Sequence, residues 1–248
     1  MAGSDEVINP RVVILKTGTT YPQIKDHFGD FDAWFVRGLS SQLNLTIADV
    51  TQAPPPGEPG DWQGIVITGS PAMVSDLAPW SEQAATWLKQ AVEAGVPVLG
   101  VCYGHQLLAH ALGGKVGYHP RGRETGTHSI KLFETAKSDP LFSLFPREFP
   151  AQLTHKQSVL ELPPGAVLLG ESAFEPHQAF RIGENAWGVQ FHPEFTDQIM
   201  KAYLEVQYPD LAQEGLDASG LMNSVRPAPE ASRLLERFSD WILQKQRR

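Results

Sequence analysis

The segment from Gly95 to Gly114, GVPVLGVCYGHQLLAHALGG, is the feature that most constrains the fold of this chain. Residues 97–101 form a short apolar run, which is typical of a strand buried on both faces. From Tyr103 onward, apolar residues recur every three or four positions, and the pair Gly113-Gly114 provides a stop. The sequence therefore predicts a strand that turns directly into a helix at Cys102.

Cys102 is the only cysteine of the chain, and glycines stand two positions to either side of it, at Gly100 and Gly104. A strand that turns sharply into a helix needs small residues at these positions, because the backbone folds back on itself. A thiol at a helix N-terminus also lies near free amide N–H groups and the positive end of the helix dipole, which favour the thiolate. A lone cysteine is more often an inert buried residue, but the two glycines and the change of period indicate a nucleophile.

A nucleophilic cysteine needs a base, and the base needs a group that orients it. The strand-like segment Ala186–Phe195, AWGVQFHPEF, carries His192 and Glu194 two positions apart. In an extended chain, side chains at i and i+2 point to the same face, so the Glu194 carboxylate is expected to hold the imidazole while its other nitrogen faces Cys102. Pro193 is expected to keep this stretch extended.

The rest of the chain alternates strands and helices, which is the pattern of a mostly parallel central sheet with helices on both faces. Strands are expected at 12–15, 43–50, 64–67 and 97–101, with helices over 28–39 and 81–93. After Gly114, short β segments predict a small antiparallel extension, at 127–132, 151–154, 167–170, 179–182 and 187–191. A short helix or turn is expected at 138–145, and helices are expected at 197–207 and 231–244.

The length of 248 residues favours one α/β domain spanning 1–248, because two domains would each have a thin core. Its core is expected at about 12–195, followed by a C-terminal helical extension at about 196–248. The segment 208–229 has neither a helical nor a strand period. A lid over the site and a plain surface connection both stay open for it.

Composition narrows the classes of function. A net charge of −8 and a pI of about 5.5 argue against nucleic acid as a partner. A single cysteine excludes an internal disulfide, and the polar N-terminus and the lack of long apolar runs favour a cytoplasmic protein without membrane contact. The histidines show no zinc-site spacing, and no phosphate-binding or dinucleotide motif occurs, so no metal, no cofactor and no ATP-consuming synthetase domain are expected.

Three motifs in order, IVITGSP at 65–71, GVCYGHQ at 100–106 and GVQFHPEF at 188–195, resemble the class I (triad) glutamine amidotransferase family. The resemblance covers about 12–195 and is strongest to the glutaminase domain of GMP synthase. It implies a flavodoxin-like fold with a nucleophile elbow and a Cys-His-Glu triad formed by Cys102, His192 and Glu194.

The resemblance also implies an oxyanion hole made by backbone N–H groups, one from Tyr103 and one from the loop at Gly69 and Ser70. Without the elbow, that loop would be read as an ordinary glycine turn. Gln106 lies one helical turn beyond Cys102 on the same side of the helix, and the family uses the matching glutamine to hold its substrate.

Residues 123–129 resemble the family segment whose backbone binds the amino-acid end of the substrate. Gly126, Thr127 and His128 are therefore further substrate-binding candidates, although His128 could equally be an ordinary strand residue. His155 resembles a family histidine near the site, without an assigned task.

These observations predict hydrolysis of the side-chain amide of glutamine through a γ-glutamyl thioester, with release of glutamate and of ammonia for a separate synthetase subunit. An alternative with the same chemistry is a stand-alone hydrolase of γ-glutamyl amides, such as γ-glutamyl peptides or polyamines, which differs in the pocket for the leaving group. An alternative of another class is a catalytically silent regulatory or binding subunit.

Overall fold

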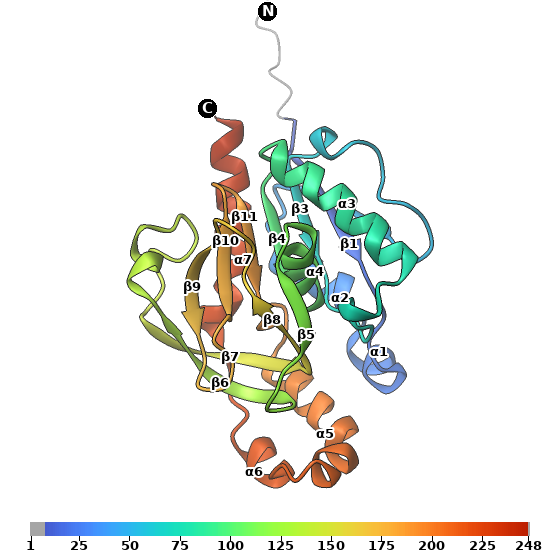
Figure 1. Cartoon of the computed structure of the whole chain (residues 1–248), viewed down its shortest axis with the longest axis vertical. Helices are drawn as coiled ribbons and strands as arrows, with labels where there is room; N and C mark the ends of the chain where they lie inside the picture. The colour runs from blue at the N-terminus through green and yellow to red at the C-terminus, as the bar shows by residue number, and fades with distance from the viewer. Residues whose placement is uncertain (1–7, 248) are drawn as a thin grey trace, which may run out of the picture.

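The computed structural model describes residues 8–247 (Figure 1). Most of the polar N-terminus, on which the expectation of a cytoplasmic protein partly rests, is residues 1–7, which lie outside the described residues. The strands are β1 Arg11–Lys16, β2 Asn44–Asp49, β3 Gly64–Ile67, β4 Val98–Val101, β5 Lys115–Tyr118, β6 Glu124–Leu132, β7 Glu148–His155, β8 Gln157–Glu161, β9 Val167–Glu171, β10 Ala179–Ile182 and β11 Ala186–Val189. The α-helices are α1 Pro22–Phe28, α2 Phe31–Gly38, α3 Pro79–Glu93, α4 Tyr103–Ala111, α5 Asp197–Gln213, α6 Ala218–Asn223 and α7 Pro229–Gln246.

One nine-stranded sheet organises the molecule, in the order β2-β1-β3-β4-β11-β10-β9-β6-β7. The five strands from β2 to β11 are parallel, and every later pairing is antiparallel. The predicted α/β fold with a parallel sheet and an antiparallel extension is confirmed. The extension continues directly from β11, and a separate two-stranded sheet, β5 with β8, lies beside it.

Helices cover both faces of the sheet, with α3 and α4 on one face and α7 behind it (Figure 1). Successive residues of a strand point to opposite faces, so the side chains of one strand enter two different cores. In β1, Val12 and Ile14 join the cluster that contains α7, whereas Val13 and Leu15 join the cluster that contains α3 and α4. All four side chains are fully buried, which explains the continuous apolar run of this strand.

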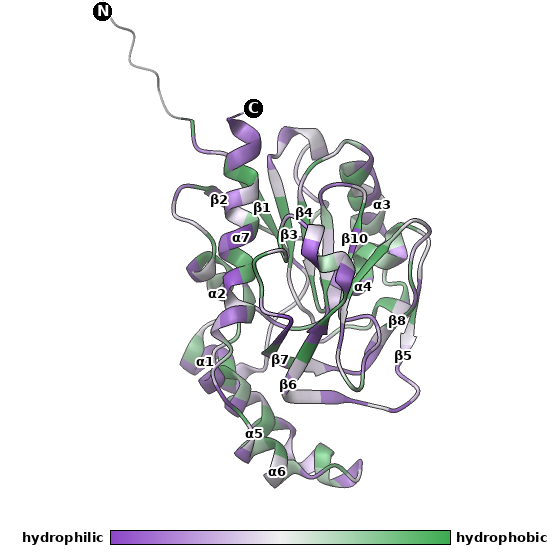
Figure 2. Cartoon of the chain, turned by 90° about the vertical axis from the view of Figure 1, so that its left-hand side faces the viewer, coloured by the Kyte–Doolittle hydropathy of each residue, from purple (hydrophilic) through white to green (hydrophobic). Residues whose placement is uncertain are grey.

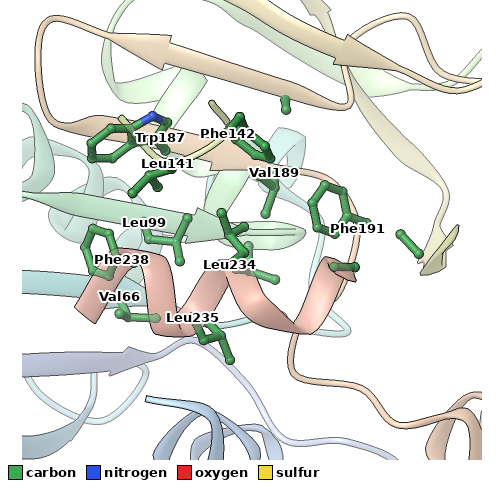
Figure 3. Close-up of a cluster of buried hydrophobic side chains, with 14 of the residues drawn as sticks. Val66, Leu99, Leu141, Phe142, Trp187, Val189, Phe191, Leu234, Leu235 and Phe238 are labelled. Carbon is green, nitrogen blue, oxygen red and sulfur yellow. The ribbon is translucent and has the colours of Figure 1, made fainter. Parts of the chain in front are cut away.

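Helix α7 closes one of these cores with a strongly amphipathic sequence. Figure 3 shows Leu234 and Phe238 of this helix near Leu99 of β4 and Trp187 of β11. The opposite face of α7 is hydrophilic (Figure 2). Among residues 8–247, no helix is both long enough and apolar enough to cross a membrane.

A third cluster packs α1, α5 and α6 together at one end of the molecule. The helix expected over 28–39 is two helices, because the left-handed Gly29 ends α1 and Asp30 caps the start of α2. The segment 208–229 was predicted to lack regular structure, but α5 continues to Gln213 through Pro209, and α6 follows. Proline removes one helical hydrogen bond, yet the fully buried Leu211 anchors the last turn of α5 in this cluster.

Candidate active site

Cys102 lies between β4 and α4 in a backbone conformation that few non-glycine residues adopt, with φ 52° and ψ −103°. Residues with this geometry persist where the surrounding structure enforces it, and they cluster at functional sites. A Cβ on Gly100 would lie 2.3 Å from the carbonyl oxygen of Gly104, and a Cβ on Gly104 would lie 2.5 Å from that of Ile67. Both glycines are therefore needed for this tight turn.

The sheet brings His192 to this turn. Strand β11 runs parallel to β4 with Val189 opposite Val101, and the amide of Cys102 donates to the carbonyl oxygen of Val189 at 2.9 Å. His192 follows β11 by three residues, and its own amide donates to the carbonyl oxygen of Gln152 at 2.9 Å. Two backbone hydrogen bonds thus hold Cys102 and His192 at the carboxyl ends of neighbouring strands.

The imidazole of His192 is oriented by Glu194 and by two aromatic rings. Its Nδ1 donates to Oε2 of Glu194 at 2.9 Å, and its ring stacks on Phe195 at 4.1 Å and on Phe31 at 6.4 Å between centroids. The expectation of an extended backbone here was wrong: residues 193–194 form a turn, closed by the amide of Phe195 on the carbonyl oxygen of His192 at 3.3 Å. The turn still brings the two side chains together, and it directs the chain into α5.

Electrostatics favour a charged His192. Its burial opposes protonation, but the Glu194 carboxylate and the Cys102 sulfur outweigh the burial and raise the pKa of His192 to about 10. Its Nε2 has no hydrogen-bond partner among residues 8–247. The Sγ of Cys102 donates to the carbonyl oxygen of Thr154 at 3.6 Å.

Cys102 and His192 both line a cavity of about 410 Å³. Its walls come from loops after β1 and β3, from the start of α4, from the β6 and β7 ends, and from α5. Ligand sites commonly form where such loops meet at the carboxyl ends of parallel strands. Within the described part of the chain, no group of three or more His, Cys, Asp or Glu side chains is arranged to hold a metal ion.

The oxyanion-hole candidates lie beside these two residues. Tyr103 is the first residue of α4 and lines the cavity; the N–H of a first helical residue has no partner within its helix. Gly69 lies against the imidazole, since a Cβ there would be 3.1 Å from Cε1 of His192. Ser70 lines the cavity, and its hydroxyl accepts from the amide of Ala72 at 3.0 Å.

Gln106 also lines the cavity, and its orientation is defined. Its Nε2 donates to the carbonyl oxygen of Gln157 at 2.9 Å and to Oε1 of Gln190 at 3.0 Å. Both N–H groups are thus used within the protein, which leaves the side-chain oxygen as an acceptor for a ligand.

The other substrate-binding candidates stand apart from the cavity. Thr127 donates its hydroxyl to Gln152 at 2.6 Å, His128 is bonded to the carbonyl oxygen of Thr125 at 2.6 Å, and neither they nor Gly126 line the cavity. Strand β7 pairs with β6, and the cavity is bordered instead by residues 154–157, which run from the end of β7 to the start of β8.

His155, whose task the sequence left open, is part of this border and forms a buried pair with Glu124. Its Nε2 lies 2.7 Å from Oε1 of Glu124, and its Nδ1 donates to the carbonyl oxygen of Gln157 at 2.7 Å. That carbonyl oxygen also accepts from Gln106, so the pair helps to hold the cavity wall. Burial disfavours both charges, but their mutual attraction prevails, so the pKa of His155 is raised and that of Glu124 is lowered.

Replacing Glu124 by glutamine should lower the free energy of unfolding by about 3–5 kcal/mol, because it leaves a buried imidazolium without its counter-charge. The raised pKa of His155 contributes stability that is full below its ordinary value of 6.5 and is lost as the pH rises through the folded value. The lowered pKa of Glu124 contributes stability that is full above its ordinary value of 4.5 and is lost as the pH falls. Urea denaturation should therefore give the largest difference from wild type between pH 4.5 and 6.5.

The exposed Glu236 on α7 provides a matched control, and Glu236→Gln should leave the stability nearly unchanged. A charged pair would be contradicted if Glu124→Gln and wild type differed little in the free energy of unfolding. It would also be contradicted if that difference were constant from pH 4 to pH 9.

The chain is also similar to known proteins in sequence and in fold. A model of the family described as glutamine amidotransferase class-I matches residues 25–208. The chain is 40% identical over 198 residues to a glutamine-hydrolyzing GMP synthase of Streptococcus pyogenes serotype M49, which covers 76% of this chain and 34% of that protein. It is 39% identical over 132 residues to the corresponding protein of Thermomicrobium roseum, with 53% and 23% coverage. The chain thus spans no more than about a third of these relatives.

Solved structures show the same fold at low identity. A glutamine amidotransferase from Thermotoga maritima superposes with a TM-score of 0.71 at 20% identity, over 96% of this chain and 98% of that chain. A glutamine amidotransferase from Methylobacillus flagellatus superposes with a TM-score of 0.68 at 24% identity, over 95% and 91%.

Proposed function

The chain belongs to the class I glutamine amidotransferase family, and on this premise we propose that it hydrolyses the side-chain amide of glutamine through a thioester on Cys102. The observation that carries the proposal is the imidazole of His192, bonded to Glu194 on one side and lining the same cavity as the strained Cys102. A base that is oriented by a carboxylate next to a nucleophile is the arrangement that acyl transfer requires.

In the first half of the reaction, the Cys102 thiolate attacks the amide carbon, while His192 carries the proton as an imidazolium. The negative charge that develops on the amide oxygen is stabilised by the backbone N–H of Tyr103 and by one from Gly69 or Ser70. His192 then protonates the departing nitrogen, so ammonia leaves and a γ-glutamyl thioester remains.

In the second half, neutral His192 takes a proton from water, and the resulting hydroxide attacks the thioester carbon. The intermediate expels the sulfur, glutamate leaves, and the imidazolium and thiolate are restored. Glu194 holds the imidazole in one orientation throughout. The sum of both halves is the conversion of glutamine and water into glutamate and ammonia.

The relatives named GMP synthase support a further step, in which a separate synthetase consumes the ammonia. The chain matches no more than about a third of those proteins, and we propose that a synthetase partner uses the ammonia released here. Stimulation of glutamine hydrolysis by such a partner would be the sign of that arrangement.

The size of the cavity favours a second candidate, hydrolysis of γ-glutamyl amides with a larger leaving group. Its volume of about 410 Å³ falls within the range of roughly 300–1,000 Å³ that holds drug-sized ligands, and it exceeds the needs of a small amino acid. The catalytic groups would be unchanged.

Purified protein incubated with L-glutamine tests the proposal directly. We expect glutamate and ammonia in equal amounts, and no ammonia from L-asparagine, which is one methylene shorter. A parallel series of γ-glutamyl amides distinguishes the second candidate, since turnover of the amides without turnover of glutamine would replace the first. Failure to hydrolyse any of them, with and without a candidate synthetase, would contradict both.

A further inference from the structure

Few charged side chains line the cavity. Apart from the two imidazoles, they are Arg123 before β6, Lys156 after β7 and Asp210 on α5. Residues 19–22 and 70–73, which also line the cavity, carry no charge. Among the described residues that line the cavity, the charge is thus confined to a few side chains. This distribution indicates a ligand that is charged at one end.

Arg123 is held in place but has hydrogen-bonding capacity to spare. Its side chain is 5% exposed, and one terminal nitrogen donates to Oε1 of Glu214 at 3.0 Å. Its Nε is buried and has no acceptor among residues 8–247. A guanidinium has five N–H donors in a planar fork that matches a carboxylate, and a buried donor without an acceptor is unfavourable. A carboxylate of the ligand would satisfy it.

Asp210 offers the opposite charge in the same cavity. It lies on α5 one turn before Glu214, the residue that pairs with Arg123. Residues four apart on a helix lie on the same face, so Asp210 and the guanidinium border the same part of the cavity. A cation and an anion side by side match an α-carboxylate and an α-ammonium on one carbon atom.

We propose that Arg123 binds the α-carboxylate and Asp210 the α-ammonium of a γ-glutamyl substrate, with Lys156 adding positive charge at the rim. The proposal rests on the proposed function and defines how that site selects an amino acid. A γ-glutamyl compound keeps both charged groups whatever leaves from its amide end.

Protection of Cys102 from alkylation tests this assignment without requiring turnover, because the chain has a single cysteine. The probes are L-glutamine, glutaramate, which lacks the ammonium, and 4-aminobutanamide, which lacks the carboxylate. Iodoacetamide labelling of Cys102, followed by mass spectrometry, gives the concentration of each compound that halves the rate.

We expect Arg123→Met to raise the half-protecting concentration of glutamine by about 10- to 100-fold, the effect of losing a charge-assisted hydrogen bond. The half-protecting concentration of 4-aminobutanamide should change less than about threefold, because this probe has no carboxylate for Arg123 to bind. Asp210→Asn should raise the half-protecting concentration of glutamine in the same way. It should leave that concentration nearly unchanged for glutaramate, which has no ammonium for Asp210 to bind. Arg123→Lys should recover part of the loss.

Two controls separate recognition from structure. Glu205→Gln removes another exposed acidic residue of α5, one that does not line the cavity, and should leave all three probes unaffected. Glu214→Gln breaks the pair with Arg123 but keeps the cation, so it reports on the pair itself.

Equal losses for all three probes in Arg123→Met and Asp210→Asn, or no loss, would overturn the assignment, even if the wild type hydrolyses glutamine. Conversely, a wild type that hydrolyses neither glutamine nor γ-glutamyl amides but keeps the expected protection pattern would overturn the proposed function and leave the binding site standing.

Discussion

Replacing Cys102 by serine should reduce the rate of glutamine hydrolysis by about 10⁴- to 10⁶-fold, the loss seen when a covalent nucleophile is removed from an intact site. A hydroxyl does not exist as its anion beside an imidazolium at neutral pH, so the ion pair on which the first attack depends cannot form. Serine is close to cysteine in size, and the elbow already tolerates a side chain here, so the fold should persist. Glutamate and ammonia release, measured over hours, provides the comparison.

The control for this variant is its thermal unfolding, which should occur within a few degrees of the wild type. Residual hydrolysis above about one tenth of the wild-type rate would mean that Cys102 is not the nucleophile, because no oxyanion hole or binding effect alone sustains such a rate. The silent-subunit alternative predicts instead that wild type and variant are equally inactive.

Replacing Glu194 by glutamine should reduce kcat/KM by about 10²- to 10⁴-fold, because an amide can hold the imidazole in the wrong tautomer and cannot stabilise its positive charge. The pH profile provides a second readout. In the wild type, the imidazolium is retained until the pH rises through a pKa of about 10. Without the Glu194 carboxylate this pKa falls, so the alkaline limb of the profile should move to lower pH.

Glu236→Gln, on the exposed face of α7, serves again as a change of the same chemistry at a remote site and should leave the profile unchanged. A Glu194→Gln enzyme with a reduced rate but an unmoved alkaline limb would indicate that Glu194 supports the loop and does not set the charge of His192.

Much of the site could be read from the sequence because its determinants are local. The elbow depends on two glycines within two residues of Cys102, and their spacing is visible in the chain. The pairing of Glu194 with His192 was also foreseen, although the extended backbone assumed for it was wrong. The two side chains meet across a turn, which the presence of Pro193 alone did not reveal.

The remainder depends on contacts between distant segments. Glu124 meets His155 because β6 and β7 pair in one register, and a shift by one residue would turn Glu124 to the other face. The second half of α5 contains Pro209, which argues against a helix locally, and the packing of Leu211 overrides it. Asp210 lies in no motif, and Arg123 belongs to the segment 123–129 but was not singled out within it. Their shared cavity is what connects the two.

The position of β11 between β4 and β10 has a consequence for the newly made chain. The ribosome releases Cys102 long before His192, which is 90 residues further along, and the gap in the sheet is closed when one of the last strands is inserted. Until then His192 is not beside the sulfur. The proposed pair of Cys102 and His192 therefore forms only when this strand has taken its place in the sheet.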